Sequence, residues 1–477
     1  WKGKHLKLYE ANIPPLLRFF HVQEVSPSGW IKLPRNKCTK VFSDDQISTC
    51  NFEIEVNYKQ VIPLPEKEDR VPYKICSFDI EASSSHGDFP VPIKTYKKLA
   101  GDVMEYLEMN PDMDEEKTRE LFVRSVKSAF GQAPTIPQID KVFPKKKFVP
   151  SVEVLDKRIS LLFSDKLNCL SVPEEEKSDK NVSTMMKIDE VFHRHNPKRD
   201  DGGEDIESGY NGYAKKQKSS GSLMDLLVDP KIVRETKIIG MTTAMNKLLP
   251  PLEGDKVTFI GSTFCNYGEK EPNYNHCVVL NGCSKLPSEN TDIETYDTEK
   301  ELLLAWQKLI QKEDPDIIIG YNIFGFDYEF MYRRAQENHC VEEFLKLSRV
   351  KNEVCGNWDR ETGEINIEES SIQIASGQHD LKFIKMNGRL QVDLYNFFRR
   401  EENLVSYKLD YVAGHFIGDF VKSIDVNETD YSSTIHTSNL TGLLVGSYIH
   451  IEEIGHTTDY YGDGAKFVVS KVDKDAG

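Results

Sequence analysis

The sequence lacks any apolar run long enough to cross a membrane, and no positively charged leader precedes an apolar segment near its start. A spanning helix needs about 18 or more consecutive apolar residues, so we expect neither a membrane span nor a signal peptide, and no membrane partner. The first residue is Trp1 rather than Met, which predicts that the chain begins within a longer protein.

Closely spaced cysteines are also missing. The nine cysteines are scattered, the closest pair being Cys277 and Cys283, and none forms a Cys-x-x-Cys motif. This pattern is typical of reduced intracellular thiols rather than of a disulfide framework or a zinc site.

Basic residues are not in excess: 61 Lys and Arg stand against 77 Asp and Glu, giving a formal net charge of −16. Proteins that grip duplex DNA usually present a basic surface, so net charge alone does not suggest nucleic acid. An acidic balance suits a site that holds divalent cations, and it permits a local basic groove. For the basic triplet Lys145–Lys147 a solvated loop is the default interpretation and a DNA contact the alternative.

A chain of 477 residues is typical of two to four domains. The large apolar side chains that a folded core needs are unevenly distributed along it. Short apolar runs between Pro and Gly predict a partial β-rich N-terminal domain at residues 1–70. We predict one domain at 71–445 with a large insertion at about 91–254, and a truncated β-rich segment at 446–477. Residues 173–221 carry too few large apolar side chains to offset chain entropy, which predicts a disordered linker or loop.

Strands alternate with helices over much of the remaining sequence. The expected strands are Tyr73–Ile80, Lys256–Cys265, His276–Leu280, Asp316–Gly320 and the start of Gln391–Phe398. The expected helices are Leu99–Leu107, Glu115–Ala129, Thr298–Gln311, Tyr328–Gln336 and Tyr407–Phe416. Such alternation on a mixed sheet predicts an α/β architecture.

The first candidate site is Asp79-Ile80-Glu81, at the end of an apolar strand. On a strand, residues two apart point to the same face, so both carboxylates project together. They repel one another unless a cation lies between them, and Mg²⁺ prefers oxygen ligands. The alternative is a strand that runs into solvent with acidic residues at its tip.

The second candidate site ends at Asp327, seven residues beyond the Ile-rich strand Asp316–Gly320. Ligand sites in α/β sheets favour this crevice beyond the carboxyl end of a strand. The alternative is structural: Asn322 shapes a turn and Asp327 caps the following helix.

The order of these motifs resembles that of the eukaryotic-type family B DNA polymerases. Phe78–Glu81, followed by Gly87–Pro90, resembles their first exonuclease motif, and Asn322-x-x-x-Phe326-Asp327 resembles the second. Further similar stretches are Tyr9–Pro14, Leu17–Phe19, Asp314–Asn322 and the delta-type segments Val392–Tyr395, Arg399–Glu401 and Tyr407–Ala413. The large insertion and the tail are most similar to polymerases of large DNA viruses of algae and protists.

The resemblance implies a ribonuclease H-like mixed sheet with flanking helices that carries a proofreading 3′–5′ exonuclease. Asp79, Glu81 and Asp327 would be its catalytic residues and would hold two Mg²⁺ ions, for which Mn²⁺ can substitute. The substrate would be the single-stranded 3′ end of a primer. Phe89 and Phe326 would pack on its terminal bases, with core packing as the alternative, and Asn322 would also contact DNA.

The implied partners are DNA, the remainder of a replicative polymerase chain and a sliding clamp bound through that remainder. The implied location is the host nucleus or a viral replication factory. The alternatives are a stand-alone exonuclease of the same superfamily and a non-catalytic DNA-binding scaffold with this fold.

Two expected features of a complete polymerase are not found. The third exonuclease motif, Tyr-x-x-x-Asp, has no match, since Tyr407 and Asp410 are three residues apart, so the fourth carboxylate is expected beyond Gly477. Tyr461-Gly462-Asp463-Gly464 lacks the second acid of a polymerase motif and is interpreted as a turn. We therefore expect no polymerisation and weak or no trimming by this chain alone.

Overall fold

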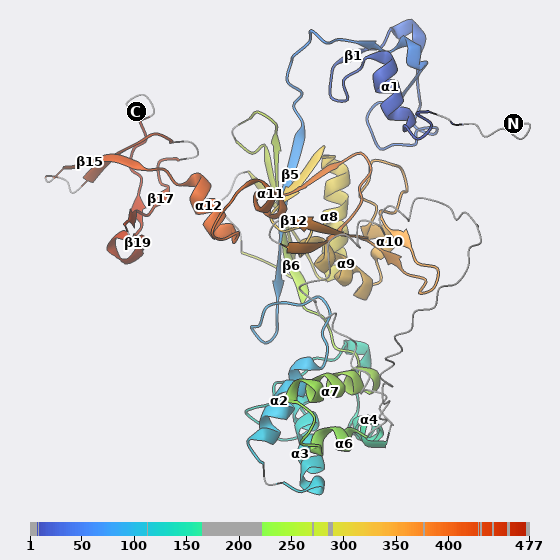
Figure 1. The fold of residues 1–477 in the computed structure, drawn as a ribbon, viewed down its shortest axis with the longest axis vertical. Coiled ribbons are helices and arrows are strands. Elements are labelled where there is room, and N and C mark those ends of the chain that lie inside the picture. Colours follow the sequence, from blue (N-terminus) through green and yellow to red (C-terminus); the bar gives the residue numbers. More distant parts are fainter. Residues whose placement is uncertain are drawn as a thin grey trace, which may run out of the picture.

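The computed structural model describes residues 7, 9–111, 113–164, 222–269, 271–284, 290–374, 377–427, 429, 432–440, 443–455 and 458–473. The stretch 173–221, predicted to be disordered, lies outside the described residues. A central sheet with its helices lies between an N-terminal part and a separate group of helices (Figure 1). Among the helices that are described, none is both long and apolar enough to cross a membrane.

The centre of the molecule is a six-stranded mixed sheet in the order β14-β9-β5-β6-β7-β8. Its strands are β5 (Lys74–Ser83), β6 (Lys256–Asn266), β7 (Tyr274–Leu280), β8 (Thr291–Tyr296), β9 (Ile317–Gly320) and β14 (Leu390–Asp393). β5 pairs antiparallel with β6 and parallel with β9, which pairs parallel with β14. The helices α8 (Glu299–Glu313) and α9 (Asp327–Glu337) flank the sheet. This arrangement confirms the predicted mixed α/β fold.

Alternation of side chains along β5 explains why this strand is central. Phe78 and Ile80 are buried, whereas Asp79 between them is exposed. The ring of Phe78 packs 4.9 Å from that of Trp306 on α8 and 5.5 Å from that of Tyr328 on α9, centroid to centroid. Burying this apolar face against two helices leaves the opposite face of the strand end free for polar groups.

The predicted insertion contains a group of helices, here called the helical unit: α2 (Lys97–Glu108), α3 (Glu115–Ala129), α4 (Val152–Ser164), α6 (Leu223–Val228) and α7 (Arg234–Leu248). These helices bury a hydrophobic core of their own. The two helices predicted from sequence correspond to α2 and α3. The other three were not predicted, because the surrounding sequence is rich in polar residues.

The N-terminal part differs from the predicted strands and turns in one respect. The apolar run at Leu16–Phe20 lies in a helix, α1 (Pro15–Gln23), with proline in its first turn where the missing N–H costs nothing. Two short antiparallel pairs follow: β1 (Ile31–Lys32) with β4 (Ile62–Pro63), and β2 (Cys38–Lys40) with β3 (Ile54–Val56). 3₁₀ turns lie at Arg35–Lys37 and Tyr58–Gln60.

Smaller elements complete the described chain. They are α10 (Val341–Phe344), β10 (Asn357–Trp358), β11 (Ile365–Asn366), β12 (Glu368–Ile374), β13 (Gly377–Phe383), α11 (Leu394–Glu401), α12 (Leu409–Ile417), β15 (Val421–Asn427), β16 (Ser432–Thr437), β17 (Tyr448–Ile449), β18 (Glu452–Ile454), β19 (Thr458–Tyr460) and β20 (Phe467–Val468). Between β19 and β20, Gly462 and Asp463 adopt positive φ angles of 59° and 54°. This confirms the turn expected at Tyr461–Gly464.

Candidate active site

Asp79 and Glu81 leave the same face of β5 near its end. Both are exposed, while Phe78 and Ile80 on the opposite face are buried, as the strand prediction requires. Opposite Asp79 on the neighbouring strand is Gly261, which has no side chain to fill the space beside the carboxylate. The pairing register shifts directly after Glu81, so the strand is irregular at the edge of this site.

Asp327 is the first helical residue of α9, and only 2% of its surface is exposed. Its Oδ1 accepts a hydrogen bond from the backbone N–H of Ile80, 3.3 Å away. Burial above all, together with the negative charge of Asp79 and a hydrogen bond with its carboxyl group, raises the pKa of Asp327 to about 8. The carboxyl group of Asp327 on α9 therefore lies beside that of Asp79 on β5, and this proximity favours the protonated form of Asp327.

The loop before α9 holds Asp327 in place through close backbone packing. A Cβ added at Gly320 would lie 2.4 Å from Cγ2 of Ile323 and 3.1 Å from the carbonyl oxygen of Phe78. Asn322 has a φ of 62°, and a Cβ on Gly325 would lie 2.3 Å from its Oδ1. Asn322 thus has the turn-shaping role considered as an alternative. Phe326 rather than Asp327 is the N-cap residue of α9, and the carboxyl group of Asp327 accepts from the backbone of Ile80 on β5.

Sequence reasoning missed Asp393 as a residue that shapes this site. It ends β14 opposite Gly320 on β9, and only 4% of its surface is exposed. Its carboxylate accepts hydrogen bonds from the backbone N–H of Asn322 (2.9 Å) and of Phe324 (3.0 Å). It also accepts from the backbone of Tyr395 (2.9 Å) and from Nδ2 of Asn396 (3.0 Å). Two signals in the sequence pointed to it: its position between a strand and a helix, and its place in the delta-type segment Val392–Tyr395.

Two of the predicted DNA contacts lie against each other. The ring of Phe89 is 75% exposed and its centroid lies 5.5 Å from that of Phe326. Phe326 is half-buried and packs 5.3 Å from Phe330 on α9. Phe326 therefore belongs partly to the core, whereas Phe89 presents an open aromatic face.

Asn322, the third predicted DNA contact, lines an open cleft of about 480 Å³. The other lining residues are Tyr321, Tyr395, Arg399 and Val405 to Leu409. Tyr321 donates a hydrogen bond to the carbonyl oxygen of Tyr407 (2.6 Å), and the guanidinium of Arg399 lies 5.1 Å from the ring of Tyr395. Aromatic faces next to a cation suit a nucleobase and its phosphate.

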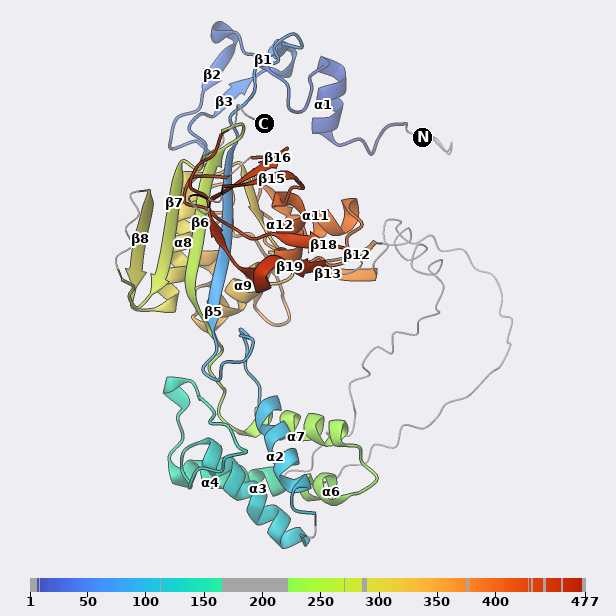
Figure 2. The ribbon, with the colours of Figure 1, turned by 90° about the vertical axis from the view of Figure 1, so that its left-hand side faces the viewer.

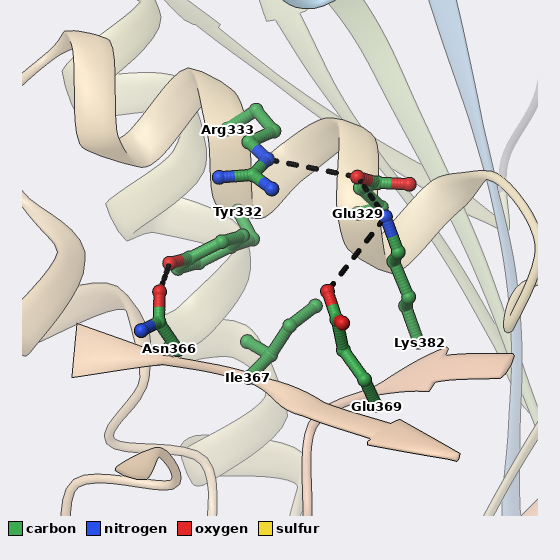
Figure 3. Close-up of a pocket in the computed structure, with 7 residues that line it drawn as sticks. All are labelled: Glu329, Tyr332, Arg333, Asn366, Ile367, Glu369 and Lys382. Atoms are coloured by element: carbon green, nitrogen blue, oxygen red, sulfur yellow. Dashed lines mark hydrogen bonds and ion pairs between the residues drawn. The ribbon is translucent and has the colours of Figure 1, made fainter. Parts of the chain in front are cut away.

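A second cavity, between α9 and β12–β13, has a different character (Figure 3). It encloses about 10 Å³, room for about one water molecule. The charged groups around it neutralise one another, since Lys382 Nζ lies 2.6 Å from Glu329 Oε1 and Arg333 Nε lies 3.6 Å from the same oxygen. This cavity is too small for a nucleotide.

The residues present fit a divalent cation in part. Asp79 and Asp327 face each other, and carboxylate oxygens are the ligands that Mg²⁺ prefers. Across the described residues, however, no group of three or more His, Cys, Asp or Glu side chains is placed to hold a metal ion. Glu81 shares the strand face of Asp79 but is not grouped with the facing pair, so its role as a ligand stays a prediction.

Comparison with known proteins places these features in one family. Residues 6–98 and 238–412 match the model of the exonuclease domain of DNA polymerase family B. The chain is 41% identical to a DNA polymerase of Phaeocystis pouchetii virus, over 98% of the chain and 45% of that protein. It is 32% identical to a DNA polymerase of Pyramimonas orientalis virus, over 93% of the chain and 33% of that protein.

A shorter region resembles a cellular enzyme. The DNA polymerase delta catalytic subunit of Mesocricetus auratus is 36% identical over 36% of the chain and 14% of that protein. The chain thus spans less than half the length of these relatives. The family match omits residues 99–237, which contain most of the helical unit.

Proposed function

The chain belongs to the family B DNA polymerases through their exonuclease domain, and from this premise we propose that it removes nucleotides from the 3′ end of single-stranded DNA. The observation that carries the proposal is the buried carboxyl group of Asp327 facing that of Asp79. Two facing acids destabilise a fold unless a proton or cation lies between them, so a purely structural role gives no reason for them.

Asp79 and Asp327 would hold Mg²⁺, or Mn²⁺ in its place, with Glu81 as a further ligand. Bound there, the ions would supply an activated water molecule and stabilise the leaving 3′ oxygen. Glu81 lies about 7 Å along β5 from Asp79, since strands rise about 3.3–3.4 Å per residue. Rotation of its side chain towards Asp79 would complete a three-carboxylate set.

The surrounding residues of this chain would hold the substrate. Phe89 would present its exposed ring to a terminal base, and Phe326 would support Phe89 through a tilted ring contact. Asn322 and the cleft that it lines would take the neighbouring nucleotide. Stacking on aromatic faces tolerates any base, as removal of a mismatched 3′ end requires.

The activity of the whole protein is part of the same proposal. The relatives are DNA polymerases, so trimming would serve as proofreading in a replicative enzyme whose remaining segments carry polymerisation. A sliding clamp would bind through those segments, and the place of action would be the host nucleus or a viral replication factory. A fourth carboxylate and its partner Tyr would come from the segments that complete the exonuclease.

The test is trimming of a 5′-labelled single strand by the chain in Mg²⁺ or Mn²⁺. We expect stepwise shortening from the 3′ end, and loss of shortening in Asp79→Ala/Glu81→Ala with an unchanged circular dichroism spectrum. The control replaces two exposed acids on α3, Glu116→Ala/Glu120→Ala, and should trim like the unaltered chain. Binding of DNA with no trimming, both by this chain and by a chain extended through the next segment of a full-length polymerase, would favour the non-catalytic scaffold.

A further inference from the structure

The segment Lys141–Val149, here called the neck loop, connects α3 to α4 of the helical unit. It runs beside the returning chain: Lys145 N–H donates to the carbonyl of Pro251 (3.0 Å), and Glu253 N–H donates to the carbonyl of Phe143 (2.9 Å). Figure 2 shows this junction at the end of the sheet where β5 ends. The loop therefore lies where the two parts of the chain meet.

The neck loop also contacts the segment that follows the first candidate motif. His86 Nε2–H donates to the carbonyl oxygen of Lys141 (2.6 Å), and the His86 ring lies 5.4 Å from that of Phe143. His86 lies five residues after Glu81 and three before Phe89. The segment carrying the exposed aromatic face of the candidate site is thus in direct contact with the neck loop.

A half-buried ion pair connects the neck loop to α9, the helix that begins with Asp327. Lys145 Nζ lies 3.4 Å from Glu337 Oε2 at the last residue of α9. The guanidinium of Arg334, 1% exposed, pairs with Glu337 (3.0 Å) and with Glu299 (2.7 Å). At 1.5 Å per residue, Glu337 lies about 15 Å along the helix from Asp327, or about four to five stacked nucleotides.

The exposed side of the neck loop is basic and apolar. Lys141, Lys146 and Lys147 are exposed, and none of them has an ion pair to any residue that the structure describes. Phe148 and Val149 are 52% and 65% exposed. In a chain of net charge −16, three exposed lysines beside an exposed phenylalanine form a local surface of the composition that binds single-stranded nucleic acid.

We propose that the neck loop binds the single strand a few nucleotides before the 3′ end held at Asp79 and Asp327. Lys141, Lys146 and Lys147 contact phosphates, and Phe148 stacks on a base. The inference rests on the proposed trimming activity and adds a second DNA contact, outside the residues that match the family's exonuclease domain. The expected ligand of the neck loop is nucleic acid, because its exposed lysines complement the negative charge of a phosphate backbone.

The first experiment measures binding of fluorescein-labelled dT16 to the whole chain without divalent cations, over a range of salt concentrations. Each single-strand phosphate contact contributes about 0.7 to the log–log salt slope, so Lys146→Gln/Lys147→Gln should lower its magnitude by about 1.4 and weaken binding roughly 10- to 25-fold at 0.1 M salt. The matched control, Lys157→Gln/Lys231→Gln, removes two exposed lysines from the helical unit outside the neck loop and should leave the slope unchanged.

The second experiment measures trimming of dT16 and dT3 with Mg²⁺. Because three nucleotides are too short to reach the neck loop, the lysine variant should raise KM for dT16 with kcat unchanged, and should trim dT3 like the unaltered chain. Equal salt slopes in the variant and its control would overturn the inference. Equal losses of trimming on dT3 and dT16 in the lysine variant would also overturn it. Unchanged DNA binding together with lost association with the remaining polymerase segments would overturn it too, and would identify a protein-docking surface.

The two experiments separate the inference from the function on which it rests. Absence of trimming by the unaltered chain and by a chain extended through the next segment of a full-length polymerase would reject the proposed function, while the salt slope still reports DNA binding at the neck loop. Trimming that is normal in the lysine variant on both substrates would reject the neck-loop contact alone. Thermal unfolding of the variant checks that the exposed substitutions leave the fold intact.

Discussion

The carboxyl group of Asp327 lies against that of Asp79, although the two residues are 248 positions apart in the chain. Asp327 reaches this position because α9 begins directly beside Ile80, whose backbone N–H it accepts. Burial and the neighbouring carboxylate both favour its protonated form. In the absence of cations the pair costs stability once Asp327 ionises, and this gives the site measurable properties.

The first prediction concerns pH. The folded-state pKa of Asp327, about 8, lies above the ordinary value of 3.8, so the folded chain holds a proton that the unfolded chain has lost. The contribution of Asp327 to the free energy of unfolding without metal should therefore be greatest below about pH 4. Between about pH 4 and pH 8 this contribution should fall, by at most about 1.4 kcal/mol per pH unit.

Asp327→Asn removes this ionisation. The free energy of unfolding is measured by urea titration in the presence of chelator. The value for the variant minus the value for the unaltered chain should increase as pH rises from 5 to 8. Asp102→Asn in the helical unit provides a comparison outside the site. A constant difference between Asp327→Asn and the unaltered chain across this range would contradict the raised pKa.

The second prediction concerns divalent cations. Mg²⁺ binds the ionised form of the facing carboxyl groups, so it must displace the proton of Asp327. Millimolar MgCl₂ should raise the melting temperature more at pH 8 than at pH 6, and chelator should reverse the effect. NaCl at matched ionic strength is the control. A rise of equal size in Asp79→Ala/Asp327→Asn would place the bound ion elsewhere.

The third prediction concerns Asp393, which acts on the site through the backbone of Asn322 and Phe324. Asp393→Ala leaves buried N–H groups without acceptors and should destabilise the chain by about 2–4 kcal/mol. Asp393→Asn keeps one accepting oxygen and should fold, but with Asp327 displaced. The kcat for trimming by Asp393→Asn should then fall. The pH dependence of the rise in melting temperature that Mg²⁺ causes should also shift.

Asp44→Asn, at an exposed acid of the N-terminal part, is the control for Asp393→Asn and should trim like the unaltered chain. A normal kcat in Asp393→Asn would show that the hydrogen bonds of Asp393 stabilise the fold without positioning Asp327.

Sequence reasoning found the residues whose signals are local. The buried positions of β5 alternate strictly around Asp79, and the Ile-rich β9 leads directly to Asp327, so both strands were predictable. Asp393 was not, because its role depends on amides about 70 residues earlier that only the folded sheet brings beside it. The helices α4, α6 and α7 were not predicted, because the wider region is rich in polar residues. Their buried apolar positions, such as Ile238, Met241 and Met245 of α7, are few and did not stand out.

The last prediction concerns how well the described acids work by themselves. Two-metal hydrolysis needs both ions fixed at the same moment, and the described residues bring only Asp79 and Asp327 together. A second ion then has too few oxygen ligands, and the attacking water lacks an orienting group. We therefore expect this chain to bind Mg²⁺ and single-stranded DNA weakly and to trim slowly. The relatives are more than twice as long, so they supply further segments for comparison.

The measurement compares this chain with one extended through the next segment of the parent polymerase, on the same 5′-labelled single strand with Mg²⁺ or Mn²⁺. The extended chain should trim faster at saturating DNA, because its added carboxylate completes the ligand set, and Asp79→Ala should abolish trimming in both. Equal rates at saturating DNA would sink the idea, and would mean that an acid already present, such as Asp393 or Asp410, completes the site. If that acid is Asp410, Asp410→Ala would then stop trimming in the shorter chain.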